Sequence, residues 1–210
     1  MKLPLTLGSL AAVLAVGTAQ ADVFVFTENV NIPIGNPVGL APVGDVSTIP
    51  TDDVISGLTV GLNVSGGYNG ALTAYLEAPN GSTVSLFNRP GLTGGNPFGY
   101  GGSGLNVTFS DTASTKLQTT PETFGSAVTG NYQAIGSLST VDGLNDNGLW
   151  TLYIADDVAG GGQPVLANWS LDLTVIPAPE PSQALAGVLV VGAALGLTAA
   201  RRRFRTPRRN

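Results

Sequence analysis

Six short segments of this 210-residue chain alternate apolar with polar residues, each apolar position being followed by a polar one. Such alternation places apolar side chains on one face of an extended strand and polar side chains on the other. The segments are Leu58–Val64, Leu72–Leu76, Val84–Leu86, Leu105–Phe109, Trp150–Ile154 and Trp169–Val175. Turn sequences separate them, among them SGGYNG, APNGS and DDVAGGGQP. No convincing helical period appears in residues 22–176, so we predict one all-β domain, a two-sheet sandwich or jelly roll.

Residues 1–21 have the pattern of a secretory signal peptide. Lys2 supplies a positive start, Leu3 to Val16 form an apolar run, and Ala19 and Ala21 form a small-x-small cleavage pattern before Asp22. The run is short and is interrupted by proline and glycine, which disfavours a permanent membrane helix. We therefore expect signal peptidase to release a domain that begins at Asp22 and is exported.

A second uncharged apolar run covers residues 184–200. At about 1.5 Å per residue it just reaches across a bilayer core of about 30 Å. Six arginines follow it: Arg201, Arg202, Arg203, Arg205, Arg208 and Arg209. Because positive charge collects on the cytoplasmic side of a membrane, we predict a transmembrane helix over residues 184–200 with its arginine-rich end in the cytoplasm and residues 22–176 outside.

The residues before this run carry a recognisable motif. Pro179, Glu180 and Pro181 precede the apolar helix and the arginine cluster, and the whole of residues 177–210 resembles the PEP-CTERM sorting signal of Gram-negative bacteria. The resemblance implies processing by an exosortase. It also implies that the protein is held transiently by the helix and then released to the cell surface or the exopolysaccharide matrix.

The exported part of the chain is strongly acidic. Residues 22–176 contain thirteen acidic residues and only two basic ones, Arg89 and Lys116, which gives a net charge of −11. Phosphates would be repelled, so nucleic acid is excluded as a partner. The sequence has no cysteine, so an exported domain must be stabilised by its core or by bound cations instead of disulfides.

The sequence also lacks the residues of the common catalytic centres. A serine triad needs a base such as histidine, cysteine catalysis needs a thiol, and the usual zinc sites take their ligands from histidine or cysteine, yet the chain has neither residue. The adjacent pairs Asp52–Asp53 and Asp156–Asp157 could act on a glycoside only if they faced each other across a cleft. We therefore predict that the protein is not an enzyme.

Carboxylates on loops make calcium the candidate cofactor. Hard cations prefer carboxylate, amide and carbonyl oxygens. Residues of this kind flank the Trp150–Ile154 segment on both sides: Asp142, Asn145, Asp146, Asp156 and Asp157. Their spacing does not match an EF-hand, and solvated turn residues without an ion are the alternative.

The aromatic residues divide into two groups. Trp150 and Trp169 lie in alternating apolar segments, so we expect them in the core. Four others are candidates for recognition, since loop aromatics often bind ligands, although a loop packed back onto the sheet is the alternative. These are Tyr68, Tyr75, Phe98 and Tyr100.

Residues 54–175 are similar to the P domain, or Homo B domain, of kexin-like and furin-like subtilases. The most specific matches are Gly148, Trp150, Leu152, Asp156, Trp169, Ser170 and Leu171. The resemblance implies a β-sandwich of jelly-roll type. The chain departs from the family at Gly66, Ala71 and Pro164, where histidine, aspartate and glycine are usual, so a family-specific polar site near Tyr68 is not expected.

These observations predict an exported, non-enzymatic structural or adhesive protein of the cell surface or extracellular matrix, with extracellular polysaccharide as a partner. The alternative is an accessory P domain that acts in trans with a secreted subtilisin-like serine protease.

Overall fold

The computed structural model describes residues 20–35, 41–49 and 52–177. The predicted signal peptide up to Ala19, the Pro179–Pro181 motif and the apolar run of residues 184–200 lie outside the described residues and stay predictions. Within the described ranges, no helix has both the length and the apolar character needed to cross a bilayer.

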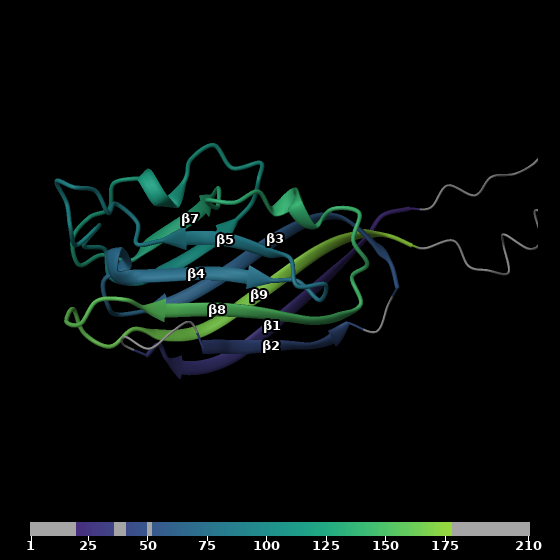
Figure 1. Ribbon diagram of the computed structural model, residues 1–210, viewed down its shortest axis with the longest axis horizontal. Coiled ribbons are helices and arrows are strands. Elements are labelled where there is room, and N and C mark those ends of the chain that lie inside the picture. Colours follow the sequence, from purple (N-terminus) through teal and green to yellow (C-terminus); the bar gives the residue numbers. More distant parts are fainter. Residues whose placement is uncertain (1–19, 36–40, 50–51, 178–210) are drawn as a thin grey trace, which may run out of the picture.

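Nine strands in this part of the chain form two sheets that face each other (Figure 1). The five-stranded sheet has the order β1 (Asp22–Pro33), β9 (Val165–Ile176), β3 (Val54–Ser65), β6 (Leu105–Phe109), β7 (Val128–Tyr132). The four-stranded sheet has the order β2 (Ala41–Ile49), β8 (Gly148–Asp156), β4 (Leu72–Glu77), β5 (Thr83–Asn88). Neighbouring strands are antiparallel except β6 and β7, which are parallel. This arrangement confirms the predicted all-β sandwich.

The alternating segments form the core between the sheets. On β3 the side chains of Val60 and Leu62 are buried, while the intervening polar positions face outward. Trp150 on β8 and Trp169 on β9 are fully buried, one from each sheet, which confirms their predicted place in the core. Burying apolar side chains from both inner faces is what holds two sheets together.

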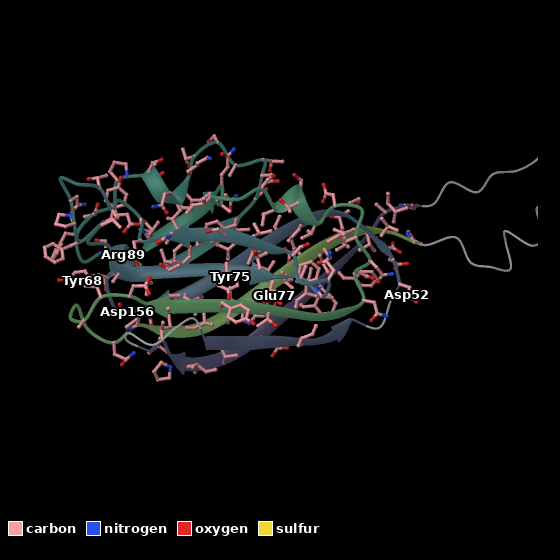
Figure 2. The ribbon with its side chains drawn as sticks, in the orientation of Figure 1. Asp52, Tyr68, Tyr75, Glu77, Arg89 and Asp156 are labelled. Carbon is pink, nitrogen blue, oxygen red and sulfur yellow. The ribbon has the colours of Figure 1, made fainter. Side chains whose placement is uncertain are left out.

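The sandwich has two ends that differ in chemistry, and β8 runs from one to the other. At the end of β8 marked by Asp156 lie the loops of residues 66–71, 89–104, 120–127 and 157–164, which we call the aromatic end. At the Gly148 end lie residues 52–53 and 142–147, which we call the acidic end. Figure 2 shows Tyr68 and Asp156 at the aromatic end and Asp52 at the opposite end. Three short 3₁₀ turns, η1 (Asn69–Ala71), η2 (Leu117–Thr119) and η3 (Leu138–Val141), connect the strands.

Candidate functional site

A pocket of about 420 Å³ opens at the aromatic end. Four aromatic rings from three separate loops line it: Tyr68, Phe98, Tyr100 and Phe124. The remaining wall is formed by small residues, including Ala71, Gly99, Gly101 and residues 158–161. No lining residue carries a charge, so the pocket is uncharged, apolar and rich in exposed backbone.

The four rings take different positions. Phe98 and Phe124 are 73% and 75% exposed, so they form the rim, whereas Tyr68 and Tyr100 are half-buried. The ring centroids of Tyr68 and Phe124 lie 5.9 Å apart, with the planes tilted by 46°. Burying a phenylalanine normally stabilises a fold by about 1.5–3 kcal/mol. Because Phe98 and Phe124 are mostly exposed, they contribute little of that stabilisation.

Close backbone contact between two loops positions the tyrosines. The amide of Gly70 donates to the carbonyl of Tyr100 (2.9 Å), and the amide of Tyr100 donates to the carbonyl of Pro90 (2.8 Å). A side chain at Gly70 would place its Cβ only 2.5 Å from the backbone of Phe98 and Tyr100. Only glycine allows this approach, so the loop sequence itself fixes where the rings stand.

A third loop is held by the buried amide of Asn69. Its Nδ2 donates to the carbonyl of Gly104 (3.1 Å) and to Oε2 of Glu122 (2.9 Å), and its Oδ1 accepts from the amide of Gly104 (3.0 Å). Glu122 stands two residues before Phe124, so these bonds place the Phe124 ring beside Tyr68.

Glu122 is the member of this network whose burial is unfavourable. Burial raises the pKa of its carboxyl, and hydrogen bonds from Asn69 and from the amide of Gly102 oppose the rise only in part. Its Oε1 is buried and has no hydrogen-bond partner among the described residues.

Arg89, one of the two basic residues of the exported part, is used structurally here. Its Nε donates to the carbonyl of Gly70 (3.3 Å) and its Nη2 to the carbonyl of Pro97 (2.9 Å). The guanidinium thus braces the loops behind the pocket, and it does not line the pocket itself.

The residues predicted as calcium ligands are divided between the two ends. Asp142, Asn145 and Asp146 lie at the acidic end, and Asp156 and Asp157 lie at the aromatic end, with β8 between them. Nine residues of strand span roughly 30 Å, so the five cannot share one ion. In the described part of the chain, no three His, Cys, Asp or Glu side chains are grouped so that they could hold a metal ion.

At the acidic end the polar groups bind each other. The amide of Asp53 donates to Oδ1 of the fully buried Asp146 (2.9 Å), and the amide of Asp146 donates to the carbonyl of Asp53 (3.0 Å). The indole nitrogen of Trp150 donates to the carbonyl of Asp146 (3.2 Å). Oδ1 of Asn145 accepts from the amide of Asn147 (2.8 Å).

At the other end of β8, the carboxylates of Asp156 and Asp157 also accept hydrogen bonds from within the protein. Oδ1 of Asp156 accepts from the amide of Val158 (3.3 Å), and burial, with a smaller part from Asp157, raises the pKa of Asp156. Oδ2 of Asp157 accepts from the hydroxyl of Thr73 (2.5 Å). Burial, followed by the charge of Asp111, raises the pKa of Asp142. Calcium binding stays a prediction.

Three of the four aromatic candidates lie in the pocket and one does not. Tyr68, Phe98 and Tyr100 line it, whereas Tyr75 stacks on Tyr153 across β4 and β8, with centroids 4.5 Å apart and planes at 13°. Tyr75 alternates with buried core residues, so its ring lies on the outer face of the four-stranded sheet (Figure 2). Sequence reasoning missed Phe124; its only local signal is its place in the turn-like segment PETFGS.

The fold and the pocket define a β-sandwich domain without a recognisable catalytic centre in its described residues. Residues 55–173, more than half of the chain, match the family model described as proprotein convertase P-domain. The chain belongs to this family. The P domain is a non-catalytic accessory domain, and β1 and β2 lie outside the matched range, each as an edge strand of its sheet.

Solved structures similar to this chain include two of the serine protease of Aeromonas sobria. One, a complex with a chaperone, has 16% sequence identity and a TM-score of 0.49, and the match covers 76% of this chain and 28% of that chain. The other, the serine protease, has 15% identity and a TM-score of 0.47, covering 74% and 27%. This chain therefore spans just over a quarter of the length of either. No curated protein sequence matches it significantly.

Proposed function

We propose that this chain is an exported, non-enzymatic P-domain protein that binds a component of the cell surface or extracellular matrix through the pocket at its aromatic end. The observation that carries the proposal is the exposure of Phe98 and Phe124, which are 73% and 75% accessible around a pocket of about 420 Å³. Apolar pockets of roughly 300–1,000 Å³ are the usual form of ligand sites, and exposed apolar patches commonly mark interaction surfaces.

The chemistry of the pocket supports binding without catalysis. Its lining residues include no carboxylate, amine or guanidinium, and the sequence contains no histidine or cysteine. General acid–base and nucleophilic catalysis most often use such groups, and the only ionisable groups among the lining residues are the phenols of Tyr68 and Tyr100.

Export and sorting are proposed from the sequence. Ala19 and Ala21 suit signal peptidase, and Pro179, Glu180 and Pro181 suit an exosortase. We expect protein from the natural host to begin at Asp22 and to have lost the residues after roughly Pro181. Intact-mass measurement tests this, with Glu180→Gln as the matched variant that should retain the tail. Recovery of wild-type protein only with its full tail, in the inner membrane, would show that the C-terminal segment is a simple anchor.

The binding proposal is tested by retention of the full chain on immobilised extracellular matrix material from the host. We expect the wild-type chain to be retained and the double variant Phe98→Ala/Phe124→Ala to pass through. Leu149→Ala is the control, because Leu149 is 48% exposed but lies at the opposite end of β8. Equal retention of wild type and double variant would overturn the assignment of this pocket.

Membership of the proprotein convertase P-domain family favours one second candidate, an accessory domain acting in trans with a secreted subtilisin-like serine protease. It predicts that the chain co-purifies with such a protease from culture supernatant and prolongs its activity on heating. Retention on matrix material without any effect on secreted protease activity would favour the first proposal.

A further inference from the structure

We infer that the pocket at the aromatic end takes a neutral saccharide, whose sugar rings stack on the rim phenylalanines while its hydroxyl groups bond to the tyrosines and the glycine backbone. This inference rests on the proposed function, and it names the chemical class of the ligand. Sugar rings present faces of C–H groups that pack on aromatic rings, whose faces carry partial negative charge. Phe98 and Phe124 offer two such faces at the rim.

The pocket also offers hydrogen-bonding groups that the fold leaves unused. The hydroxyls of Tyr68 and Tyr100 make no hydrogen bond to any described residue, and neither do the amides of Gly160 and Gly161. Each hydroxyl can donate and accept, and each amide can donate. An apolar pocket with a few polar groups of this kind suits a ligand that combines an apolar face with many hydroxyls, which a hydrocarbon or an apolar peptide side chain does not.

Charge selects against anionic ligands, and the pocket lining offers no carboxylate to pair with a cationic one. Arg89 is committed to the carbonyls of Gly70 and Pro97, so no cation is available for a carboxylate or phosphate. The carboxyl of Glu122 is bonded to Asn69 on one oxygen and buried on the other, so no carboxylate lines the pocket for a cation. With a net charge of −11 over residues 22–176, acidic polymers are repelled as well. A neutral ligand suits this lining, because none of its groups would be left beside an unpaired charge.

The Tyr68 ring packs against the glycine-rich loop of residues 160–162. Gly161 has φ +84°, and a Cβ there would meet the Tyr68 ring. Gly162 has φ +90°, yet a Cβ there would meet nothing. A side chain that is already ordered in the free protein loses less conformational freedom when a ligand binds. The two glycines therefore form a matched pair: Gly161→Ala should displace Tyr68, while Gly162→Ala carries the same backbone cost without touching the pocket.

The test uses the full chain in a detergent without a sugar headgroup, on host matrix material treated in three ways. Periodate cleaves the vicinal diols of sugars, a broad protease removes proteins, and buffer alone is the reference. We expect periodate to abolish retention and protease to leave it unchanged. The apparent affinity should fall at least tenfold in Phe98→Ala/Phe124→Ala and in Gly161→Ala, but less than twofold in Gly162→Ala. Melting curves establish that each variant is folded.

The possible outcomes distinguish a failure of the saccharide inference from a failure of the proposed binding function. Retention that survives periodate and is lost after protease would overturn the saccharide and leave a binding module with a protein ligand. No retention of the wild-type chain, or equal retention of the rim variant, would overturn the proposed function itself. As a direct observation, saturation of the aromatic protons should transfer to the ring C–H protons of a neutral oligosaccharide released from the matrix, and not to an oligogalacturonate.

Discussion

The two ends of this sandwich close the same strands with opposite chemistry. At the acidic end, backbone and side chains are bonded to each other: Asp53 and Asp146 exchange two hydrogen bonds, and the Asn147 side chain donates to Asp52 (3.0 Å). At the aromatic end, glycine-rich loops are bonded internally, but Phe98 and Phe124 are left in solvent. Both ends therefore stabilise the fold through hydrogen bonds, but only the aromatic end also exposes large apolar rings that the fold does not need.

The largest effect that tests this contrast is expected at Asp146. Asp146→Ala removes the acceptor of the Asp53 amide at a fully buried position, so we expect a loss of about 2–3 kcal/mol and a fall in Tm of about 5–10 °C. Retention on matrix material should not change. Asp146→Asn keeps an oxygen acceptor and should cost less.

For Phe124→Ala we expect the opposite of the Asp146→Ala result. Retention on matrix material should be lost, and the free energy of unfolding should change by no more than about 0.5 kcal/mol. Thermal melting and the retention assay on both variants check the pair. The contrast fails if Asp146→Ala weakens retention as strongly as Phe124→Ala does.

A smaller effect is expected at Glu122, whose carboxyl is largely buried at the aromatic end. Because its pKa is raised in the folded protein, Glu122 contributes stability below the ordinary glutamate pKa of about 4.3 and loses that contribution as pH rises through the folded pKa. Glu122→Gln has no such titration. At pH 7 we expect it to be slightly more stable than wild type, with the difference vanishing near pH 4.

Urea melts between pH 4 and pH 7 measure this difference, with Glu77→Gln on β4 as the control outside the aromatic end. A Glu122→Gln variant that is less stable at every pH would show that the Asn69 bond outweighs the cost of burying the carboxylate.

The last prediction concerns calcium. The candidate ligands are divided between the two ends, so an ion at either end could use only some of them. If the calcium prediction from the sequence holds, calcium should raise Tm by several degrees more than sodium chloride of equal ionic strength, and equal midpoints would reject a specific site. Melting with calcium, with chelator and with matched sodium chloride decides this. A rise of several degrees with calcium alone would confirm the calcium site predicted from the sequence, and Asp146→Asn and Asp156→Asn would locate it.

The strands that the sequence predicts are those in which apolar and polar residues alternate along the sequence. All six predicted segments correspond to β3, β4, β5, β6, β8 and β9. The sequence of β1, DVFVFTENV, gives no such signal, because Val23 and Val25 are exposed on one face while Phe24 and Phe26 pack against the core on the other. β7, with the sequence VTGNY, has too few apolar residues and forms through parallel pairing with β6.

The pocket could be predicted only in part, for a related reason. Turn composition places Tyr68, Phe98 and Tyr100 on loops, but nothing local says that these loops meet. The loop that carries Phe124 is held by bonds between distant residues: the amide of Gly125 donates to the carbonyl of Gly101 (2.7 Å), and Glu122 is bonded to Asn69, 53 positions away. Tyr75 lies outside the pocket because strand alternation places its ring on the outer face of the four-stranded sheet, and a role for it in recognition stays a prediction.

The pairing of β1 with β9 has a mechanical consequence. Asp22 lies opposite Val175, so the described chain enters and leaves the sandwich side by side, at the end remote from the pocket (Figure 1). A pull between a ligand in the pocket and the C-terminal end of β9 would run along the strands. β9 is hydrogen-bonded on one side to β1 and on the other to β3, so that pull would load both ladders in shear, with many bonds sharing the force at once. Such a strand can be extracted only by breaking the bonds together, whereas a strand peeled from an edge gives way one bond at a time.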